Sequence, residues 1–222
     1  MNNKEKNMVI ERYNKRLQEF GYSPKTLGWS KSKHNLRYHI LLSLWNLDGT
    51  DVLDFGCGFG DMYGYAKQIG IKFNYHGIDI NENLISLAKQ IYPGANLATR
   101  DVFQEGLLQK YDYIFSSGVH NLKLKDNWDF IAKTFELFNK YSTCGFALNF
   151  LSSKVDYELE ETYHTNPVQI LELAYKYSNK VVLRNDYMPF ESTVFIDKQN
   201  DFDKNVVVYP EFIKYVSEDS KF

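Results

Sequence analysis

A chain of 222 residues fits one large α/β domain or two small ones, and we expect a single domain. The 26 Lys and Arg residues nearly balance the 28 Asp and Glu residues, so no overall positive field favours nucleic acid as a partner. Two cysteines are too few for a disulfide framework, the first residues are too polar for a signal peptide, and no apolar run is long enough to span a bilayer. We therefore expect a cytoplasmic protein with no membrane partner.

The first 48 residues are predicted to form a helical cap. Apolar side chains at helical spacing predict one helix over residues 9–20 and a second over about 33–47, and the connection at 21–32 contains Gly, Pro and Ser. Residues 1–37 carry nine Lys or Arg and three Glu. That excess indicates either a surface that attracts an anionic substrate or, by preference, a solvated helix surface.

A glycine-rich turn follows the first predicted strand. Residues 51–61 read DVLDFGCGFGD, in which a short apolar strand runs into three glycines at alternate positions. Glycine permits positive φ and lets a ligand lie against the main chain. The helix predicted at 61–69 points its unpaired N–H groups toward the turn, so a nucleotide cofactor is expected there. A dinucleotide fingerprint would need glycine where Asp61 stands, and Asp54 would repel a pyrophosphate.

The acid and the glycines resemble motif I of the class I S-adenosylmethionine-dependent methyltransferases. The pattern acid-x-Gly-x-Gly-x-Gly is matched position by position at Asp54, Gly56, Gly58 and Gly60. The cofactor of that family carries a sulfonium and an ammonium group, which an acidic turn favours over a diphosphate. The resemblance covers roughly residues 52–197. It implies an α/β fold with a doubly wound, mostly parallel seven-stranded sheet, a three-layer αβα arrangement and a C-terminal antiparallel hairpin strand.

The second strand, predicted at about 74–80, ends in an acid. Asp79 lies 25 residues after Asp54, close to the spacing at which an acid reaches a ribose hydroxyl. In the resembling family this acid binds both ribose hydroxyls of the cofactor. Asn81 then predicts the N-cap of a helix over 82–92.

The third and fourth strands are predicted to end at the same edge of the sheet. The third, at 95–99, leads to Asp101 and Val102, to which the resemblance assigns the adenine amino group and the adenine ring. The fourth, at 111–116, leads to residues 117–121, where the reacting end of the cofactor should lie. The signatures of adenine and cytosine methyltransferases are absent there, so modification of nucleic acid bases loses its best support.

The helical N-terminal cap is expected to act as a lid, because such segments often cover the cofactor in this family. The predicted cofactor contacts are Tyr13, Trp29 and Arg37 in the lid, Asp54, Gly56, Cys57, Gly58 and Gly60 in the glycine turn, and Asp79, Ile80, Asp101, Val102, Ser117 and Gly118 at the ends of the later strands. For the three lid residues, a purely structural packing role is an equally strong alternative.

The second half of the chain is predicted to complete the sheet. A helix capped by Asp126 leads to a nearly apolar strand at 143–151, and a polar and aromatic insertion at 152–165 is expected to carry substrate contacts. A short connection makes the last two strands, 180–185 and 192–197, antiparallel. The predicted divisions of the chain are a cap at 1–48, a Rossmann-like core at 49–198, and a tail at 199–222 with an edge segment near 206–209 and a short helix after Pro210.

Methyl transfer to a hydroxyl group is helped by a general base, and His has a suitable pKa at neutral pH. His120 follows the fourth strand, on the rim where the methyl group should point, and is the first candidate; His164 in the insertion is the second. The alternative for His120 is a loop histidine that packs beside the cofactor. Ser116 and Ser117 stand where a metal-assisted enzyme would carry carboxylates, so no metal is expected.

The leading prediction is therefore an S-adenosylmethionine-dependent methyltransferase that methylates an oxygen atom of a small-molecule acceptor by in-line displacement. The alternatives are an RNA or protein methyltransferase, a protein that binds S-adenosylmethionine without catalysis, and a nicotinamide dehydrogenase. The sequence predicts neither the identity of the acceptor nor the oligomeric state.

Overall fold

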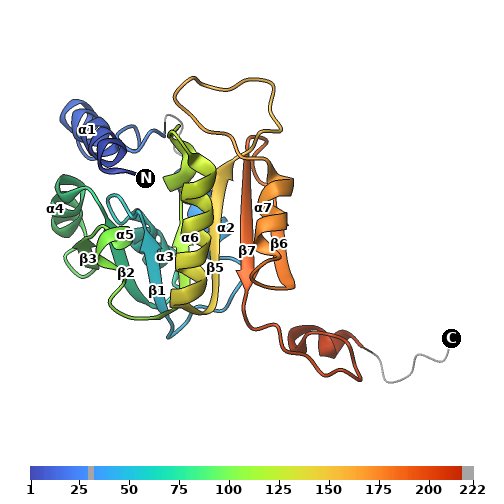
Figure 1. Ribbon diagram of the computed structural model, residues 1–222. Helices are drawn as coiled ribbons and strands as arrows, with labels where there is room; N and C mark the ends of the chain where they lie inside the picture. The colour runs from blue at the N-terminus through green and yellow to red at the C-terminus, as the bar shows by residue number, and fades with distance from the viewer. Residues whose placement is uncertain (30–32, 217–222) are drawn as a thin grey trace.

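Strands rich in apolar, β-branched and aromatic residues form one seven-stranded sheet in the computed structural model, which describes residues 1–29 and 33–216 (Figure 1). The strands lie in the order β3-β2-β1-β4-β5-β7-β6. Their bounds are β1 (Asp51–Phe55), β2 (Asn74–Asp79), β3 (Asn96–Thr99), β4 (Tyr111–Ser116), β5 (Ser142–Leu151), β6 (Lys180–Arg184) and β7 (Glu191–Asp197).

Strands β3, β2, β1, β4 and β5 are parallel, whereas β7 is antiparallel to both of its neighbours, β5 and β6. The predicted mostly parallel sheet with a C-terminal antiparallel hairpin is confirmed. Strand order reverses between β1 and β4, which are neighbours although two strands separate them in the sequence. In open α/β sheets a ligand crevice forms at the carboxyl ends of the strands at such a point.

Helices cover both faces of the sheet (Figure 1). Side chains alternate along a strand, so neighbouring residues join different cores. Leu53 packs in the core beneath α6 and α7, whereas Val52 packs in the core beneath α2 and α3. The helices are α1 (Asn3–Phe20), α2 (His34–Leu41), α3 (Asp61–Ile69), α4 (Glu82–Ile91), α5 (Val102–Glu105), α6 (Asn127–Tyr141) and α7 (Pro167–Ala174), with 3₁₀ turns η1 (Val119–Asn121) and η2 (Pro210–Tyr215).

The two N-terminal helices differ from their predicted bounds. α1 begins at Asn3 rather than at residue 9, because Asn2 and Glu5 form a capping box in which each side chain accepts a hydrogen bond from the other residue's backbone N–H. α2 ends at Leu41 rather than near 47, since the chain turns there and the Ser43 hydroxyl donates to the Ile40 carbonyl. The cap is therefore one long helix and one short one.

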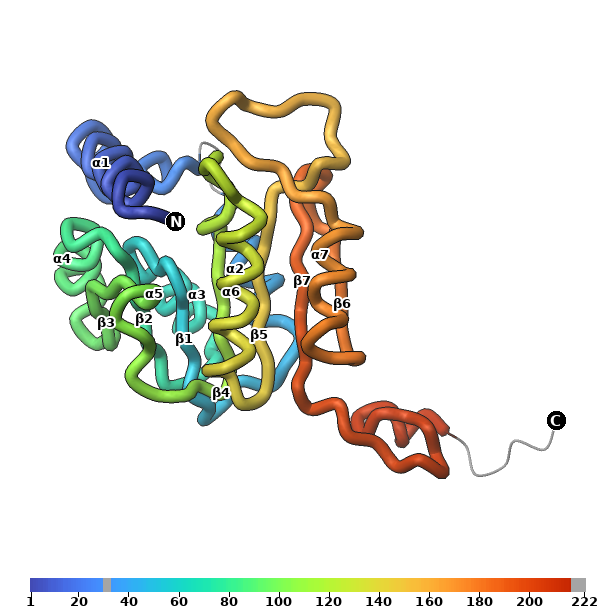
Figure 2. Tube along the Cα trace, viewed as in Figure 1, coloured from blue at the N-terminus to red at the C-terminus, as the bar shows by residue number. Residues whose placement is uncertain are grey.

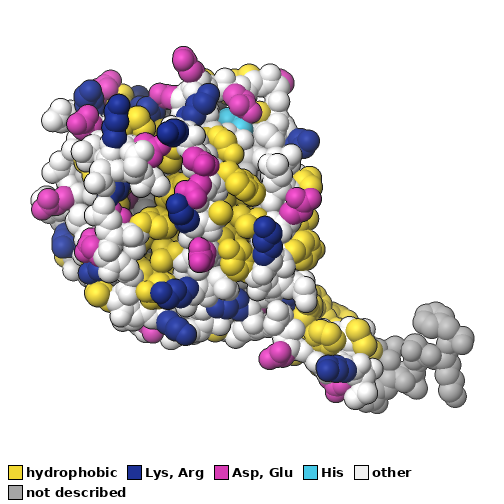
Figure 3. Space-filling view, in the orientation of Figure 1, with side chains coloured by type: hydrophobic (Ala, Val, Ile, Leu, Met, Phe, Trp, Pro, Cys, Tyr) yellow, Lys and Arg dark blue, Asp and Glu magenta, His cyan; other side chains and the backbone are white. Residues whose placement is uncertain are grey.

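Residues 199–216 of the C-terminal tail extend away from the sheet (Figure 2). The prediction of an edge segment near 206–209 is wrong, because only an isolated bridge between Asp203 and Val208 forms there, whereas the short helix after Pro210 is found as η2. Apolar side chains such as Val207 and Phe212 are exposed on the tail (Figure 3). Residues 30–32 of the predicted connection and 217–222 of the tail lie outside the described residues. Within residues 1–29 and 33–216, no helix combines the length and apolarity that a membrane span requires.

Candidate functional site

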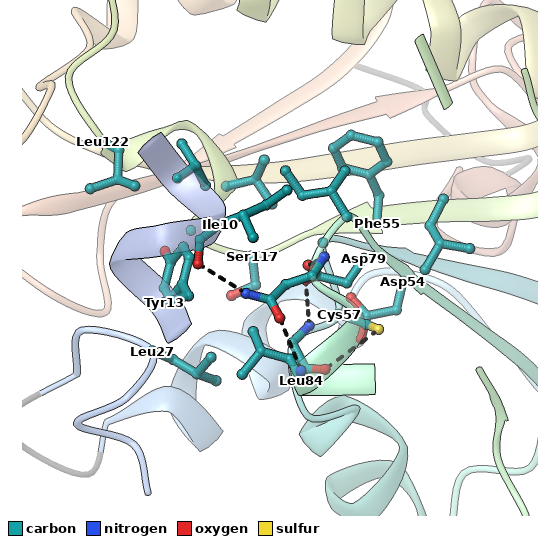
Figure 4. Close-up of a pocket in the computed structure, with 18 of the residues that line it drawn as sticks. Ile10, Tyr13, Leu27, Asp54, Phe55, Cys57, Asp79, Leu84, Ser117 and Leu122 are labelled. Atoms are coloured by element: carbon teal, nitrogen blue, oxygen red, sulfur yellow. Dashed lines mark hydrogen bonds between the residues drawn. The ribbon is translucent and has the colours of Figure 1, made fainter. Parts of the chain in front are cut away.

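A cavity of about 1140 Å³, measured out to its mouth in the solvent, lies at the carboxyl ends of β1, β2 and β4 (Figure 4). Its floor is formed by the glycine turn after β1, the end of β2, the turn into α5 and the turn after β4. Its roof is formed by α1 together with Leu27 and Trp29. Figure 4 shows Tyr13 of α1 on the side opposite Asp54 and Cys57. The cavity thus lies at the point where strand order reverses.

Gly56 shows why the turn after β1 requires glycine. Its φ is +70°, and a Cβ atom there would lie 2.2 Å from Cγ2 of Val119. The N–H groups of Gly56 and Cys57 donate to the Ile78 carbonyl at 2.8 and 3.0 Å, which ties the turn to β2. Only glycine fits at position 56, because its φ is positive and the Val119 side chain packs directly against its backbone.

Asp54 brings a buried carboxyl group to the cavity. It is 2% exposed and accepts a hydrogen bond of 2.8 Å from the Tyr75 hydroxyl. The pKa of Asp54 is raised to about 7, mainly by burial and also by the negative charges of Asp79 and Asp61, whereas the hydrogen bond from Tyr75 opposes the rise. A cation placed against this group would favour its ionised form.

Asp79 stands at the end of β2 and organises the backbone around it. One of its oxygens accepts from the N–H of Gly58 and the other from the N–H of Asn81, both at 2.9 Å. Asn81 in turn caps α4 by accepting from Leu84 N–H, as predicted. Burial raises the pKa of Asp79, and its hydrogen bonds from backbone N–H groups oppose that rise. Each carboxylate oxygen can still accept a further hydrogen bond from a ligand.

Asp101 has two roles in the structure. One oxygen accepts from Phe103 N–H at 3.2 Å and caps α5, which is a common role for an acid that follows a strand. The other oxygen forms an ion pair with the Lys6 ammonium group of α1. Both Asp101 and Val102 line the cavity. The carboxylate therefore links the lid to the cavity floor.

The lid helix α1 is held by polar contacts rather than by a buried apolar face. It has no buried residue, yet Ile10 and Tyr13 line the cavity. Arg12 forms two hydrogen bonds of 2.8 Å with the carboxylate of Glu161, which belongs to the 152–165 insertion. An exposed pair of this kind contributes little to stability, so Arg12 and Glu161 tie α1 to the insertion only weakly.

The turn after β4 is supported from β5. The N–H of Gly118 donates to the side-chain oxygen of Asn149 at 2.7 Å, and the Asn149 amide donates to the Ser117 hydroxyl at 3.3 Å. Asn149 is a polar residue within the nearly apolar strand predicted at 143–151. The amide of a buried side chain needs hydrogen-bond partners, and this requirement is the signal in the sequence that could have indicated a polar turn beside Asn149.

Twelve of the fourteen predicted cofactor contacts line this one cavity, although they come from six different segments of the chain. They are Tyr13, Trp29, Asp54, Gly56, Cys57, Gly58, Asp79, Ile80, Asp101, Val102, Ser117 and Gly118. Apolar lining residues that were not predicted as contacts include Ile10, Leu27, Tyr38, Leu122 and Phe130.

Gly60 and Arg37 are not among the described residues that line the cavity. Gly60 has a φ of +74° and begins α3, and a Cβ atom there would lie 3.3 Å from Leu97, so its role is packing. Arg37 is buried in an ion pair with Glu191 instead of facing the cavity. The prediction that these two residues contact the cofactor directly does not agree with where they lie.

The prediction that His120 lies on the rim is wrong. The side chain is 1% exposed, and its ring packs against Phe130 and Phe150 beneath α6. Its Nε2 atom lies 3.1 Å from the Thr134 hydroxyl, which donates to a backbone carbonyl. Burial lowers the pKa of His120 to about 3, so the imidazole is neutral and a weak base.

His164 does not line the cavity either. Its Nδ1 atom lies 2.8 Å from the Ser152 carbonyl and 4.0 Å from Glu158, so it pins the two ends of the insertion together. None of the five histidines is among the described residues that line the cavity.

Replacement of His120 by Gln is expected to leave the affinity for S-adenosylhomocysteine within about twofold of wild type, because the ring does not reach the cavity. The free energy of unfolding should fall by about 1–2 kcal/mol, since the amide fits the Thr134 contact poorly in a buried place. Calorimetric titration and urea denaturation measure the two quantities. If the variant lost affinity for S-adenosylhomocysteine while its free energy of unfolding was unchanged, His120 would have to contribute to ligand binding.

Three comparisons agree with this geometry. A family model described as a methyltransferase domain matches residues 52–140. A Mycobacterium tuberculosis (strain ATCC 25618 / H37Rv) protein, Rv1506c, whose name describes it as a methyltransferase, is 30% identical over 159 residues; the match covers 68% of this chain and 95% of the relative.

Solved structures show the same fold. Magnesium protoporphyrin IX methyltransferase from Synechocystis PCC 6803 with bound S-adenosylhomocysteine has a TM-score of 0.62 at 15% identity, over 86% of this chain and 98% of that one. A TehB-like S-adenosylmethionine-dependent methyltransferase from Corynebacterium glutamicum ATCC 13032 has a TM-score of 0.56 at 20% identity, over 86% of this chain and 99% of that one.

Proposed function

Because the chain belongs to the class I S-adenosylmethionine-dependent methyltransferases, we propose that it transfers the sulfonium methyl group of this cofactor to an oxygen atom of a small-molecule acceptor. S-adenosylmethionine supplies an activated methyl group, and the bond between methyl carbon and sulfur breaks with its electron pair left on sulfur. The residues of the chain have to bind the cofactor, orient the acceptor and exclude water.

The lining of the cavity fits the cofactor. Asp54 is a buried acid beside the glycine turn, and its raised pKa marks a position that a cation would stabilise. Asp79 offers two carboxylate oxygens for the ribose hydroxyls, and Asp101 with Val102 offers an acceptor and an apolar wall for adenine. Gly56 and Gly58 line the cavity beside these acids and bring the backbone of the glycine turn to its surface.

The enclosure of the cavity supports a small acceptor. α1 and Trp29 cover the cavity, and Arg12 links α1 to the insertion through Glu161, so a small acceptor fits beneath this cover without displacing it. Lys6 and Arg12 from the basic N-terminal segment are engaged in ion pairs within the chain, which removes part of the support for an RNA acceptor.

The side chains that line the cavity also bear on which class of oxygen acceptor can react. No imidazole is among the described lining residues, and burial lowers the basicity of His120. An acceptor that is already anionic at neutral pH needs no general base. We therefore place carboxylates and acidic phenols ahead of alcohols.

Incubation of the protein with methyl-labelled S-adenosylmethionine and a cell extract tests the acceptor class, when the extract is first divided into low-molecular-mass, RNA and protein fractions. Label is expected in the low-molecular-mass fraction, and mild alkali should release it if the product is a methyl ester. Label in the RNA or protein fraction contradicts the proposal. Binding of S-adenosylhomocysteine without transfer to any fraction would instead favour a non-catalytic binding protein.

A further inference from the structure

A buried ion pair joins α2 to the far side of the sheet. The Arg37 Nε atom donates to both carboxylate oxygens of Glu191, at 2.6 and 2.8 Å, and a second guanidinium nitrogen also donates to that carboxylate. Arg37 is 3% exposed and Glu191, at the start of β7, is 1% exposed. Both side chains are therefore removed from water almost completely.

The guanidinium group supports Trp29. Its central carbon lies 3.6 Å from the centre of the Trp29 ring, which is a stacked cation–π contact. Trp29 lines the cavity, whereas neither Arg37 nor Glu191 is among the described lining residues. The ion pair thus contacts the wall of the cavity at the indole.

The indole in turn closes the cavity beside the turn after β4. A Cβ atom at Gly118 would lie 2.6 Å from the Trp29 ring, so only glycine allows this approach. Gly118 is also held by Asn149, so its own position is fixed independently of Trp29. The position of the Trp29 wall therefore depends also on the Arg37 guanidinium group that stacks on the ring.

Burial of the pair is weak evidence for a role in stability. Removing two charges from water costs several kcal/mol for each ion, and apolar replacements of a buried pair are often neutral or stabilising. Geometry gives a better reason to retain it, because a planar guanidinium can bind a carboxylate through its edge while it stacks on an aromatic ring. Lysine cannot do both.

We propose that Arg37 and Glu191 are positioning residues that fix Trp29 as a wall of the cavity at the turn after β4. This inference rests on the proposed function, since it assumes that the cavity holds the cofactor and that its reacting end lies near Gly118. The pair gives the short helix α2 a direct influence on the site, although no atom of Arg37 needs to touch a ligand.

The double replacement R37M/E191L tests this role, because it removes both charges and keeps side chains of similar size. The protein is expected to fold with nearly unchanged thermal stability and to bind S-adenosylhomocysteine about tenfold more weakly. R37K, which keeps a charge for Glu191 but cannot stack in the same way, should show a comparable loss of affinity.

The double replacement R184M/D186L is the matched control, since it removes an exposed Arg–Asp pair close to β7. It should bind S-adenosylhomocysteine as the wild type does. In a W29A background, R37M/E191L should cause no further loss of affinity, because the wall it holds is gone. The inference is overturned if R37M/E191L and R37K bind S-adenosylhomocysteine with wild-type affinity. It is also overturned if R37M/E191L loses as much affinity in the W29A background as in the wild type. In either case the proposed function still holds as long as the wild type binds the cofactor and transfers its methyl group.

Discussion

Asp79→Ala is expected to weaken S-adenosylhomocysteine binding by about 100-fold or more. Its carboxylate is proposed to accept hydrogen bonds from two ribose hydroxyls, and hydrogen bonds to a charged group contribute about 1.5–3 kcal/mol each. The same oxygens accept from the N–H groups of Gly58 and Asn81, so the substitution also loosens the glycine turn. Calorimetric titration of wild type and variant measures the difference.

Asp112→Ala is the matched control for this experiment. Asp112 also accepts from a backbone N–H, that of Asp51, at 2.9 Å, and from the Thr143 hydroxyl, but it lies at the amino end of β4. It should lose stability without losing affinity. Asp79→Asn keeps one acceptor oxygen and should lose roughly tenfold. Equal affinities of Asp79→Ala and Asp112→Ala would show that Asp79 faces no ligand.

Local patterns predicted most of the helices and strands, whereas the arrangement of the strands in one seven-stranded sheet came from the resemblance to the methyltransferase family. The alternation of apolar strands with helices, the caps at Asn81 and Asn166, and the short connection before β7 all depend on neighbours within a few residues. The antiparallel hairpin followed from connection length alone. The carboxyl ends of parallel strands meet at one edge, so the acids that follow β1, β2 and β3 could be brought together without knowledge of any contact.

The side chains that were misplaced depend on contacts distant in the sequence. Arg37 meets Glu191 across 154 positions, and no local pattern reveals that partner. His120 lies two residues after Gly118, which has a φ of +75°, and its imidazole packs against Phe130 beneath α6 instead of lining the cavity. The local sequence does not show in which direction this side chain points, because packing against distant residues decides it.

The start of α1 is a different case, because the residues that determine it are close together in the sequence and could have been used to predict it. Asn2 and Glu5 have the spacing of a capping box, which places the helix start at Asn3. The predicted start at residue 9 rested on the apolar stripe alone and did not use the cap. The consequence is functional, since the longer helix carries Lys6 to Asp101 over the cavity.

The cavity combines acidic groups with burial, and this combination makes its electrostatics depend on what it holds. Asp54 and Asp79 are both buried, and burial raises the pKa of each. Without a cation nearby, Asp54 is about half neutral at pH 7, because burial and, less strongly, the charge of Asp79 raise its pKa to about 7. A positively charged cofactor changes that balance, so binding and proton release should be coupled.

Cofactor affinity is accordingly expected to rise with pH between 6 and 8, by roughly tenfold, as Asp54 ionises with a pKa of about 7. The bound cation favours the carboxylate, and protonation competes with binding below pH 7. The folded protein holds this proton more tightly than the unfolded chain, so for Asp54 the stability of the cofactor-free protein falls as pH rises from about 4 to 7. Titration of S-adenosylmethionine in two buffers with different ionisation enthalpies should show about half a proton released by Asp54 at pH 7.

Asp54→Asn isolates this contribution. The variant should bind the cofactor more weakly at pH 8, because the counter-charge is lost, and its affinity should vary less between pH 6 and 8. The amino group of the cofactor loses its own proton near pH 8 in both proteins, so the difference between wild type and variant reports Asp54 alone. His120 does not interfere, since burial lowers its pKa to about 3. Identical pH profiles for wild type and Asp54→Asn would mean that no cation binds at Asp54, and the position proposed for the charged end of the cofactor would have to be abandoned.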